Sequence, residues 1–383
     1  MKITFDAVPI CSDKMSGIGW CELGQTQALA KLFPHNQYEY SFFTSGDNER
    51  VKRVKQFAGK DIKLNTSGFS GFVYRAVSNF LPIPYSFFFG RKSDITHFFN
   101  YIVPPFVNGR KVVTVHDMVY KTFPETVRGR TRYMLDTGLK RSMKRADLIV
   151  TDSEFSKSEI IKYFPKWESK IRVVPCGVDL ERFRPCTEPQ RIPEVKKSLE
   201  IEGEYFLYVG TIEPRKNLER LMTAYAAFAK KAGENAPKLV LAGGKGWLDK
   251  GIYSRVEKLG MEKNIIFTKY IPSEDMNPLM CGALAFVFPS IYEGFGMPPL
   301  EAMACGVPVL TSGEASLPEV TGDCAVICDA YDVKSIAQGL YRLYSDEKLR
   351  KELSRRGLER AQGFTWERSA KMLMDVYREL KHE

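Results

Sequence analysis

The stretch from Pro289 to Val309 reads PSIYEGFGMPPLEAMACGVPV and places a glycine-proline loop directly before a short predicted helix. Two loop glycines, Gly294 and Gly296, let backbone N–H groups come close to a bound anion. A helix that begins near Pro298 or Pro299 adds the positive end of its dipole at the same place. The stretch therefore predicts a phosphate-binding loop.

Two carboxylates flank this loop, Glu293 before it and Glu301 within the predicted helix. Carboxylates repel phosphate, so they suit the site only if they accept hydrogen bonds from hydroxyl groups. Sugars and ribose supply such hydroxyls next to a diphosphate. We therefore expect a nucleotide-sugar as the ligand. The alternative is a tight turn before a surface helix whose glutamates are merely solvated.

Apolar runs that suit buried parallel strands recur along both halves of the chain. They are Lys2–Ala7, Tyr38–Phe43, Ile95–Phe99, Lys111–Val115 and Leu148–Thr151 in the first half, and Tyr205–Val209, Lys238–Ala242, Ile265–Phe267, Ala283–Phe288 and Pro308–Thr311 in the second. Amphipathic or loop sequence separates them, which predicts two doubly wound α/β domains. Because such sheets bind ligands outside the carboxyl ends of their strands, we expect an active-site cleft between facing loops.

The predicted domain boundary lies between Gly177 and Ile201, a segment with few long apolar runs and several prolines that should break helices. Those prolines are Pro185, Pro189 and Pro193. We expect an N-terminal domain over residues 1–177 and a C-terminal domain over residues 178–363. The segment Phe364–Leu380 has apolar residues near helical spacing and predicts a terminal helix.

The composition limits which ligands and which cellular compartment fit the protein. The chain has 383 residues, 44% of them hydrophobic, which fits a two-domain globular enzyme. Its net charge of +10 suits a phosphorylated ligand, an anionic lipid surface or nucleic acid. Eight scattered cysteines lack metal-type spacing and predict reduced, mostly buried thiols, so we expect no metal. Asp6 interrupts the first apolar run where a secretory signal would continue, and we expect a cytoplasmic protein.

The two glutamates, separated by seven residues and followed by Ala-Cys-Gly-Val-Pro-Val, resemble the retaining glycosyltransferases of family 4, which have the GT-B fold of two Rossmann-like domains facing a central cleft. The resemblance covers nearly the whole chain. It implies that Glu293 contacts the transferred sugar, that Glu301 binds ribose hydroxyls, and that residues 364–383 cross back onto the first domain as a helix. It also implies that backbone groups of the loop hold the diphosphate and sugar. The loop residues are Gly294, Phe295, Gly296, Met297, Pro298 and Leu300.

A second cluster follows the predicted strand Tyr205–Val209, where the chain reads GTIEPRKNL. The adjacent cations Arg215 and Lys216 predict a diphosphate clamp that stabilises the departing nucleoside diphosphate without a metal. Many members of the family have arginine at the position of Thr211, so the cationic role passes to Arg215 and Lys216. The alternative is a solvated helix start that carries two charges.

His116 follows the predicted strand Lys111–Val115. The resemblance implies that this histidine lies close to the transferred sugar and helps to orient the donor and the developing oxocarbenium charge. A lone histidine is more often structural, but the strand-end position and the resemblance favour a catalytic role. We interpret His97 as partly buried and structural.

Three further segments carry weaker signals. Gly17 and Gly19 occupy two positions of a dinucleotide fingerprint, but Glu22 replaces its third glycine. In family 4 such a glycine loop approaches donor phosphate and acceptor; a plain tight turn is the alternative. The resemblance also implies that the backbone at Tyr270 and Ile271 reads the nucleotide base. The sequence TDSEFS at residues 151–156 predicts that Ser153 caps a helix.

Residues 128–145 carry seven basic side chains and one acid, with apolar residues interleaved. The basic residues are Arg128, Arg130, Arg132, Lys140, Arg141, Lys144 and Arg145. This segment could contact an anionic membrane, and the aromatic stretch Phe69–Phe89 could help to receive a lipid-linked acceptor. A core helix with a solvated cationic face explains the segment equally well. No nucleic-acid module accompanies it, so we expect no nucleic-acid partner.

These features together predict a retaining, metal-independent transferase that moves a hexose to a glycan or polyprenyl-linked saccharide at the inner face of the membrane. The sequence GTIEPRKN and the double proline resemble bacterial mannosyltransferases of polysaccharide assembly, which favours GDP-mannose as donor and requires no further cofactor. Three alternatives stay open: a UDP-sugar donor, a non-catalytic nucleotide-sugar binding protein, and a Rossmann oxidoreductase, which the missing third glycine disfavours.

Overall fold

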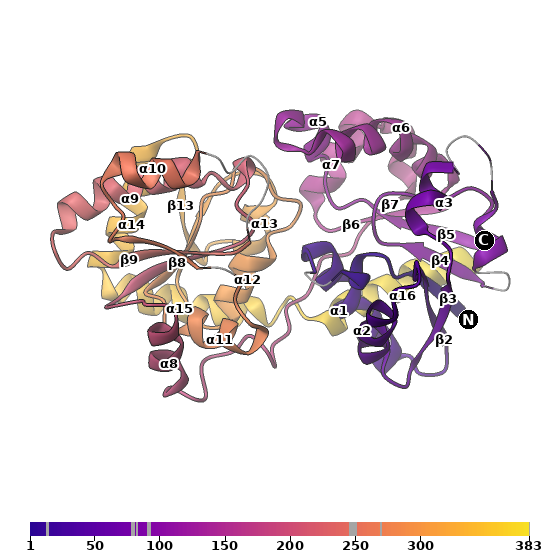
Figure 1. Ribbon diagram of the computed structural model, residues 1–383, viewed down its shortest axis with the longest axis horizontal. Helices are drawn as coiled ribbons and strands as arrows, with labels where there is room; N and C mark the ends of the chain where they lie inside the picture. The colour runs from indigo at the N-terminus through magenta and orange to yellow at the C-terminus, as the bar shows by residue number, and fades with distance from the viewer. Residues whose placement is uncertain are drawn as a thin grey trace. The chain divides into compact units, whose positions relative to one another are not determined.

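The computed structural model describes residues 1–12, 15–77, 81, 83–89, 93–244, 251–268 and 270–382 and divides into two compact units (Figure 1). The first unit comprises Met1–Thr122, Gly129–Gly177 and Trp366–Glu383, and the second comprises Phe123–Arg128 and Val178–Thr365. Both units are built on a parallel sheet, as the apolar runs predict. Each is therefore a Rossmann-like α/β domain.

Two short segments lie in a different unit from the one that the sequence favours. Residues Phe123–Arg128, expected in the N-terminal domain, belong to the second unit, where the Phe123 ring packs edge-on against Tyr292 at 5.7 Å. Phe364 and Thr365, expected in the terminal helix, also belong to the second unit. The Val178 N–H donates to the Phe364 carbonyl at 2.9 Å and holds them there.

The first unit has a seven-stranded sheet in the order β3-β2-β1-β4-β5-β6-β7. Its strands are β1 (Lys2–Asp6), β2 (Gln37–Phe43), β3 (Ile62–Ser67), β4 (Ile95–Phe98), β5 (Arg110–Thr114), β6 (Leu148–Thr151) and β7 (Ile171–Val173). Its helices are α1 (Gly17–Leu32), α2 (Asn48–Ala58), α3 (Gly71–Val77), α4 (Tyr85–Phe88), α5 (Val119–Thr122), α6 (Gly129–Arg145), α7 (Glu154–Tyr163) and α16 (Trp366–His382), with 3-10 helices η1 (Pro9–Cys11) and η3 (Pro165–Lys170). Helices α1, α2 and α16 lie on one face of the sheet, and α6 and α7 on the other (Figure 1).

The second unit has a six-stranded sheet in the order β10-β9-β8-β11-β12-β13. Its strands are β8 (Tyr205–Val209), β9 (Lys238–Ala242), β10 (Ile265–Thr268), β11 (Ala285–Phe288), β12 (Val309–Ser312) and β13 (Ala325–Cys328). Its helices are α8 (Arg191–Ser198), α9 (Leu218–Ala232), α10 (Ile252–Leu259), α11 (Ser273–Cys281), α12 (Met297–Ala304), α13 (Leu317–Thr321), α14 (Val333–Ser345) and α15 (Glu347–Ala361), with 3-10 helices η2 (Pro124–Thr126) and η4 (Pro214–Lys216). Helices α9, α10 and α14 lie on one face, and α11, α12 and α15 on the other (Figure 1).

The terminal helix α16 is part of the first unit's core. It packs along α1, where the Trp366 ring lies so close to Gly24 that an added Cβ would sit 2.3 Å from the ring. Gln25 of α1 donates a hydrogen bond to Ser369 at 3.0 Å. Tyr377 lies 2.7 Å from Nδ1 of His97, which is fully buried rather than partly buried as the sequence suggests.

The predicted linker contains a helix. Helix α8 runs from Arg191 to Ser198 and includes Pro193, which we expected to break helices. Pro193 is the third residue of α8, and N–H groups of a first helical turn have no partner within the helix, so a proline there removes no hydrogen bond. None of the helices in the described part of the chain is long and apolar enough to span a bilayer.

Candidate active site

Two neighbouring strands of the second unit bring three charged side chains together. Arg215 and Lys216 end η4, which follows β8, and Glu293 follows β11, the strand paired with β8. Arg215 Nη1 lies 2.8 Å from Glu293 Oε2, and Lys216 Nζ lies 2.6 Å from Glu293 Oε1. The Ile291 N–H also donates to the Arg215 carbonyl at 2.8 Å. The carboxyl ends of these strands thus join the two predicted motifs into one ionic cluster.

A fourth charge completes this cluster. Arg215 Nε lies 2.6 Å from Oε1 of Glu213, a buried residue whose role the sequence did not indicate. Burial alone would raise the pKa of Glu293, but Arg215 and Lys216 lower it to about 2. Burial and the neighbouring Arg215 lower the pKa of Lys216, against the opposing effect of Glu293. Two cations and two anions therefore neutralise one another in a site with little access to water.

The loop after Glu293 has the backbone geometry expected of an anion-binding turn. Gly296 has φ +107°, and an added Cβ would lie 2.8 Å from the Leu317 side chain, so this position requires glycine. The Ser316 hydroxyl lies 2.9 Å from the carbonyl of Glu293 and 2.8 Å from that of Phe295 and ties the loop to the start of α13. These contacts hold the loop before α12 in one conformation.

Helix α12 begins directly after Gly296, and no side chain caps its first turn. Pro298 lies in this turn, where its missing N–H costs no hydrogen bond. The Met297 N–H and the positive end of the helix dipole can therefore face a phosphate, whereas Pro298 has no N–H to donate. Leu300 is buried and anchors the helix in the core.

Glu301 lies on α12 and is electrostatically unlike Glu293. Burial raises its pKa to about 7, Arg182 opposes this shift and Asp179 adds to it. The carboxyl group is thus close to half-ionised at neutral pH. A ligand that donates hydrogen bonds to the carboxylate, as ribose hydroxyls do, would favour its ionised form.

The structure places the other predicted donor-binding residues at the carboxyl ends of β8 and β10. Thr211 is exposed two residues after β8, and its carbonyl accepts a hydrogen bond from Tyr208 at 3.2 Å. Ile271 is buried, whereas the adjacent Tyr270 is 57% exposed. Lys269, between Tyr270 and β10, lies outside the described residues.

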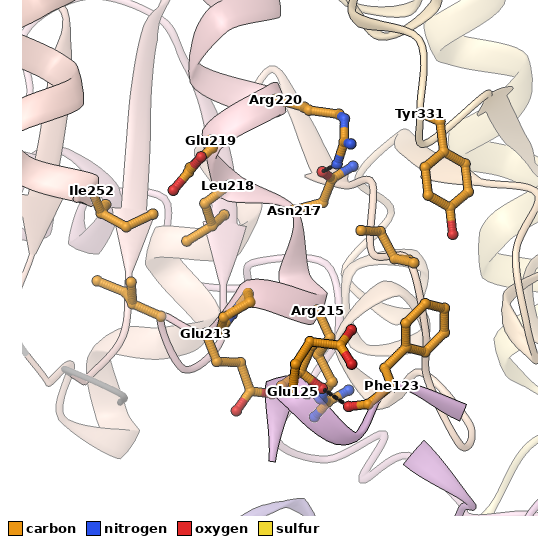
Figure 2. Close-up of a pocket in the computed structure, with 14 residues that line it drawn as sticks. Phe123, Glu125, Glu213, Arg215, Asn217, Leu218, Glu219, Arg220, Ile252 and Tyr331 are labelled. Atoms are coloured by element: carbon orange, nitrogen blue, oxygen red, sulfur yellow. Dashed lines mark hydrogen bonds and ion pairs between the residues drawn. The ribbon is translucent and has the colours of Figure 1, made fainter. Parts of the chain in front are cut away.

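A cavity of about 330 Å³ adjoins the ionic cluster within the second unit (Figure 2). Glu213 and Arg215 line one end of it, and Asn217 and Tyr331 line the other. Asn217 adopts the left-handed conformation with φ +62° and donates to the carbonyls of Pro289 and Ala330 at 3.0 and 2.7 Å. Asn217 thereby connects the loop of the cations to the loop that leads to Glu293, a role that the sequence did not reveal.

His116 lies at the end of β5 in the first unit, as predicted, but both of its ring nitrogens have protein partners. Nδ1 lies 2.6 Å from Asp152 Oδ2, and Nε2 lies 2.7 Å from the Phe99 carbonyl. Burial opposes the charged imidazole, yet the Asp152 carboxylate raises its pKa to about 9. We predicted no role for Asp152, which precedes the predicted cap Ser153. The structure confirms the cap: Ser153 accepts a hydrogen bond from the Ser156 N–H at 3.0 Å.

The two predicted glycines lie in the first turn of α1 rather than in a free loop. Gly17 is exposed, and an added Cβ would contact nothing within 4 Å. A Cβ on Gly19 would lie 2.9 Å from the Pro9 carbonyl, so Gly19 permits the close approach of α1 to η1. Glu22, which replaces the third glycine of a dinucleotide fingerprint, is fully buried, and both of its carboxyl oxygens lack a hydrogen-bond partner.

The cysteines are all free thiols, and six of the eight are buried, in agreement with the sequence. Within the described residues, Cys21, His116 and Asp152 form a group whose potential ligand atoms lie within 4.8 Å of one another. The hydrogen bond between His116 and Asp152 already pairs two of these atoms. We assign no metal to this group.

Comparison with known proteins agrees with this geometry. A family model described as glycosyl transferases group 1 matches residues 191–360, and one described as Glycosyltransferase Family 4 matches residues 25–182. The chain is 37% identical over 290 residues to the O-antigen chain mannosyltransferase B of Escherichia coli, an alignment that covers 75% of this chain and 74% of that protein. It is 28% identical to a serotype-specific mannosyltransferase WbdA of Escherichia coli over 71% of this chain, but it spans only 34% of that longer protein.

Solved structures show the same fold. Anabaena HepE, in complex with UDP and glucose, matches with a TM-score of 0.74 over 99% of this chain and 100% of that one, at 16% identity. Sucrose-phosphate synthase from Thermosynechococcus elongatus matches with a TM-score of 0.74 over 100% and 99% of the two chains, at 20% identity. With the two parallel sheets and the two family models, these matches show that the chain belongs to the family 4 glycosyltransferases, of the GT-B fold.

Proposed function

We propose that this enzyme transfers mannose from GDP-mannose, with retention and without a metal, to a glycan or polyprenyl-linked saccharide in the synthesis of a cell-surface polysaccharide. The observation that carries the proposal is the position of Glu293 between Arg215 and Lys216 at the start of the glycine loop. Both a diphosphate and a sugar hydroxyl find partners in this arrangement.

The two cations account for departure of the nucleoside diphosphate. The leaving group gains negative charge as the glycosidic bond breaks, and cations fixed in a site of low dielectric stabilise that charge strongly. In the structure Glu293 pairs with both Arg215 and Lys216. A bound diphosphate would share these cations with Glu293, whose remaining lone pairs can accept hydrogen bonds from the sugar.

The same pairing argues against Glu293 as a covalent nucleophile. A carboxylate whose oxygens each lie within 2.8 Å of a cation is a weak nucleophile because the cations stabilise its lone pairs. Retention then follows from front-face attack: the acceptor oxygen bonds to the anomeric carbon on the side from which the diphosphate leaves. A phosphate oxygen takes the acceptor's proton. Glu293 positions the sugar.

The choice of mannose and of the acceptor rests on relatives. The relative with 37% identity is named an O-antigen chain mannosyltransferase. The donor base and the sugar are therefore proposals about this chain, with UDP-sugars as the competing donors.

A peripheral membrane contact would suit a lipid-linked acceptor. Helix α6 buries Leu135 and Leu139, while Tyr133 is 70% exposed among basic residues. We expect Lys140, Arg141 and Lys144 to attract anionic headgroups, each by about 1 kcal/mol. Part of the predicted aromatic stretch, residues 78–80 and 82, lies outside the described residues.

Vesicle flotation tests the membrane contact. The protein should bind phosphatidylglycerol vesicles and not phosphatidylcholine vesicles, and glutamate at positions 140, 141 and 144 should abolish binding. Glutamate at Lys348 and Lys351 of α15 is the matched control. Equal binding to both vesicle types would contradict the proposal.

Product stereochemistry tests the reaction. The enzyme, GDP-α-mannose and a mannose-terminated acceptor are incubated, and the anomeric configuration of the new bond is read by NMR. An α-linked mannoside supports retention, and a β-linked product excludes it. Donor binding without transfer or hydrolysis would favour the alternative of a non-catalytic nucleotide-sugar binding protein.

A further inference from the structure

His116 has a surrounding network that its neighbours in the sequence do not reveal. The imidazole joins the carboxyl ends of three adjacent strands: β5, which ends just before it, β4 through the Phe99 carbonyl, and β6 through Asp152. The Ser156 hydroxyl of α7 donates to the His116 carbonyl at 2.9 Å. The residue is therefore held by its main chain and by both ring nitrogens.

The segment that follows His116 is fixed by the same network. The Tyr101 hydroxyl donates to Asp117 Oδ1 at 3.1 Å, and the Val119 N–H donates to the same oxygen at 3.2 Å. The Tyr101 ring packs edge-on against the imidazole, with ring centroids 5.8 Å apart. Movement of the imidazole would therefore disturb the backbone from His116 to Val119.

Both partners of the imidazole are acceptors. The acceptor oxygens lie 2.6 and 2.7 Å from the two ring nitrogens. Because a neutral imidazole has one N–H, its other ring nitrogen would then direct a lone pair at an oxygen. The arrangement is satisfied only when the ring donates from both nitrogens. Asp152 supplies the compensating negative charge, and it also interacts with the buried thiol of Cys176.

We propose that Asp152 is a positioning residue of the transferase: by holding His116 as a cation that donates from both nitrogens, it fixes the loop after β5 in the conformation needed for transfer. The inference rests on the proposed function and on the expectation that this loop meets the sugar. The imidazole acts through the backbone that it orders, since neither ring nitrogen remains available to a substrate.

The groups that face the imidazole predict its response to pH. Asp152 faces it from β6, Cys21 from α1, and His97 from β4, while Cys176 lies near Asp152 from the segment after β7. Of these, only Asp152 supplies a strong negative charge near neutral pH, because burial lowers the pKa of His97 to about 3 and the Cys176 pKa is raised by its hydrogen bond to Cys21 and by burial. Without Asp152 the imidazole should lose its second proton below its ordinary pKa of about 6.5, because burial then opposes the charged form without compensation.

The test is the pH profile of kcat in Asp152→Asn, with Asp147→Asn as the matched control. Asp147 lies at the opposite end of β6 and pairs with Lys111 at 3.1 Å, so its variant removes a charge from the same strand without touching His116. We expect Asp152→Asn to lower kcat about 10- to 100-fold at both pH 6 and pH 8 with little change in donor KM, and to remove the fall in kcat that the wild type should show as the pH rises through about 9. Asp147→Asn should follow the wild-type profile.

A second measurement separates positioning from folding. NMR titration of the four histidines, assigned by single substitutions, should show the His116 imidazole titrating near pH 9 in the wild type and at least two pH units lower in Asp152→Asn. A wild-type kcat in Asp152→Asn, a fall in kcat near pH 9 that persists in that variant, or an unshifted His116 titration would overturn the inference. A wild type without turnover on any nucleotide-sugar would instead refute the proposed function.

Discussion

The two units bury charge differently at the carboxyl ends of their strands. In the second unit Glu213, Arg215, Lys216 and Glu293 pair with one another, so that each buried cation lies next to a carboxylate. In the first unit the cation that pairs with Asp152 is a histidine, and the buried carboxyl oxygens of Glu22 have no hydrogen-bond partner among the described residues. In the ionic cluster opposite charges balance one another, whereas the less well paired Glu22 of the first unit and Glu301 of the second should respond to pH.

Replacing Glu293 should have the largest effect on stability. Glu293→Gln leaves Arg215 and Lys216 buried with one fewer anion, and breaking a buried ion pair in this way costs about 3–5 kcal/mol. Urea unfolding of the wild type and the variant measures the difference. Glu154→Gln, an exposed glutamate on α7, should change stability by less than about 0.5 kcal/mol. Equal stability of Glu293→Gln and the wild type would show that the cluster is not an ionic unit.

The pH dependence of this effect follows from the lowered pKa of Glu293. Its folded pKa of about 2 lies below the ordinary value of about 4.3, so its stabilising contribution is present above about pH 4.3 and is lost as the pH falls towards 2. The wild type and Glu293→Gln should therefore converge in stability at acid pH.

Lys216→Met should lower kcat by about 100-fold or more if Lys216 neutralises the leaving diphosphate. Methionine retains the volume of the buried stem, so the loss reports the charge rather than a cavity. Lys230→Met, on the exposed side of α9, is the control and should leave kcat unchanged. A Lys216→Met enzyme with wild-type kcat would remove the ionic cluster from the mechanism.

Glu22→Gln should stabilise the protein, the opposite of the effect at Glu293. Burial and the neighbouring Asp6 raise the pKa of Glu22 well above its ordinary value. Between about pH 4.3 and the folded pKa, the unfolded chain releases a proton that the folded chain retains, so wild-type stability falls by about 1.4 kcal/mol per pH unit. The free energy of unfolding of Glu22→Gln does not fall in this way. In urea unfolding it should therefore exceed that of the wild type by a margin that grows from pH 5 to pH 7. A constant difference across that range would contradict the assignment.

The smallest expected effect concerns Glu301 and donor affinity. If its carboxylate accepts hydrogen bonds from ribose, donor binding should tighten as the pH rises through about 7, where Glu301 ionises. Calorimetry on Glu301→Gln should give a donor Kd about tenfold weaker than the wild type at pH 8, equivalent to about 1.4 kcal/mol, and nearly independent of pH. A pH-dependent Kd in the variant would assign the titration to another group.

Much of the fold is predictable from the sequence because parallel strands buried on both faces leave continuous apolar runs. All ten predicted runs form strands, with ends within two residues of the prediction. The edge strand β3 was missed because four of the six residues of Ile62–Ser67 are polar and most are partly exposed, and β7 because it has only three residues. Helix α8 was missed because the prediction treated every proline as a breaker, including one in a first turn.

The candidate site could likewise be predicted only in part. The approach of Lys216 to Glu293 follows from the rule that loops after neighbouring strands meet, and the structure shows this approach. The partners Glu213, Asn217 and Ser316 could not be predicted, because their contacts depend on side-chain direction and on a left-handed backbone at Asn217. The role of Asp152 was not predicted, because it precedes a capping serine and because its contact with His116 joins strand ends that are 36 residues apart.

The most direct test of the central claim is thermal stabilisation and slow donor hydrolysis with GDP-, UDP-, ADP- and dTDP-sugars, each measured with EDTA for the wild type and for Lys216→Met. We predict that GDP-mannose selectively stabilises the wild type. The wild type should hydrolyse GDP-mannose without added metal, and Lys216→Met should hydrolyse it about 100-fold more slowly. Preference for another donor would overturn the assignment of GDP-mannose alone. Failure of every nucleotide-sugar to stabilise the wild type, or hydrolysis that disappears with EDTA, would contradict a metal-independent transferase built on this cluster.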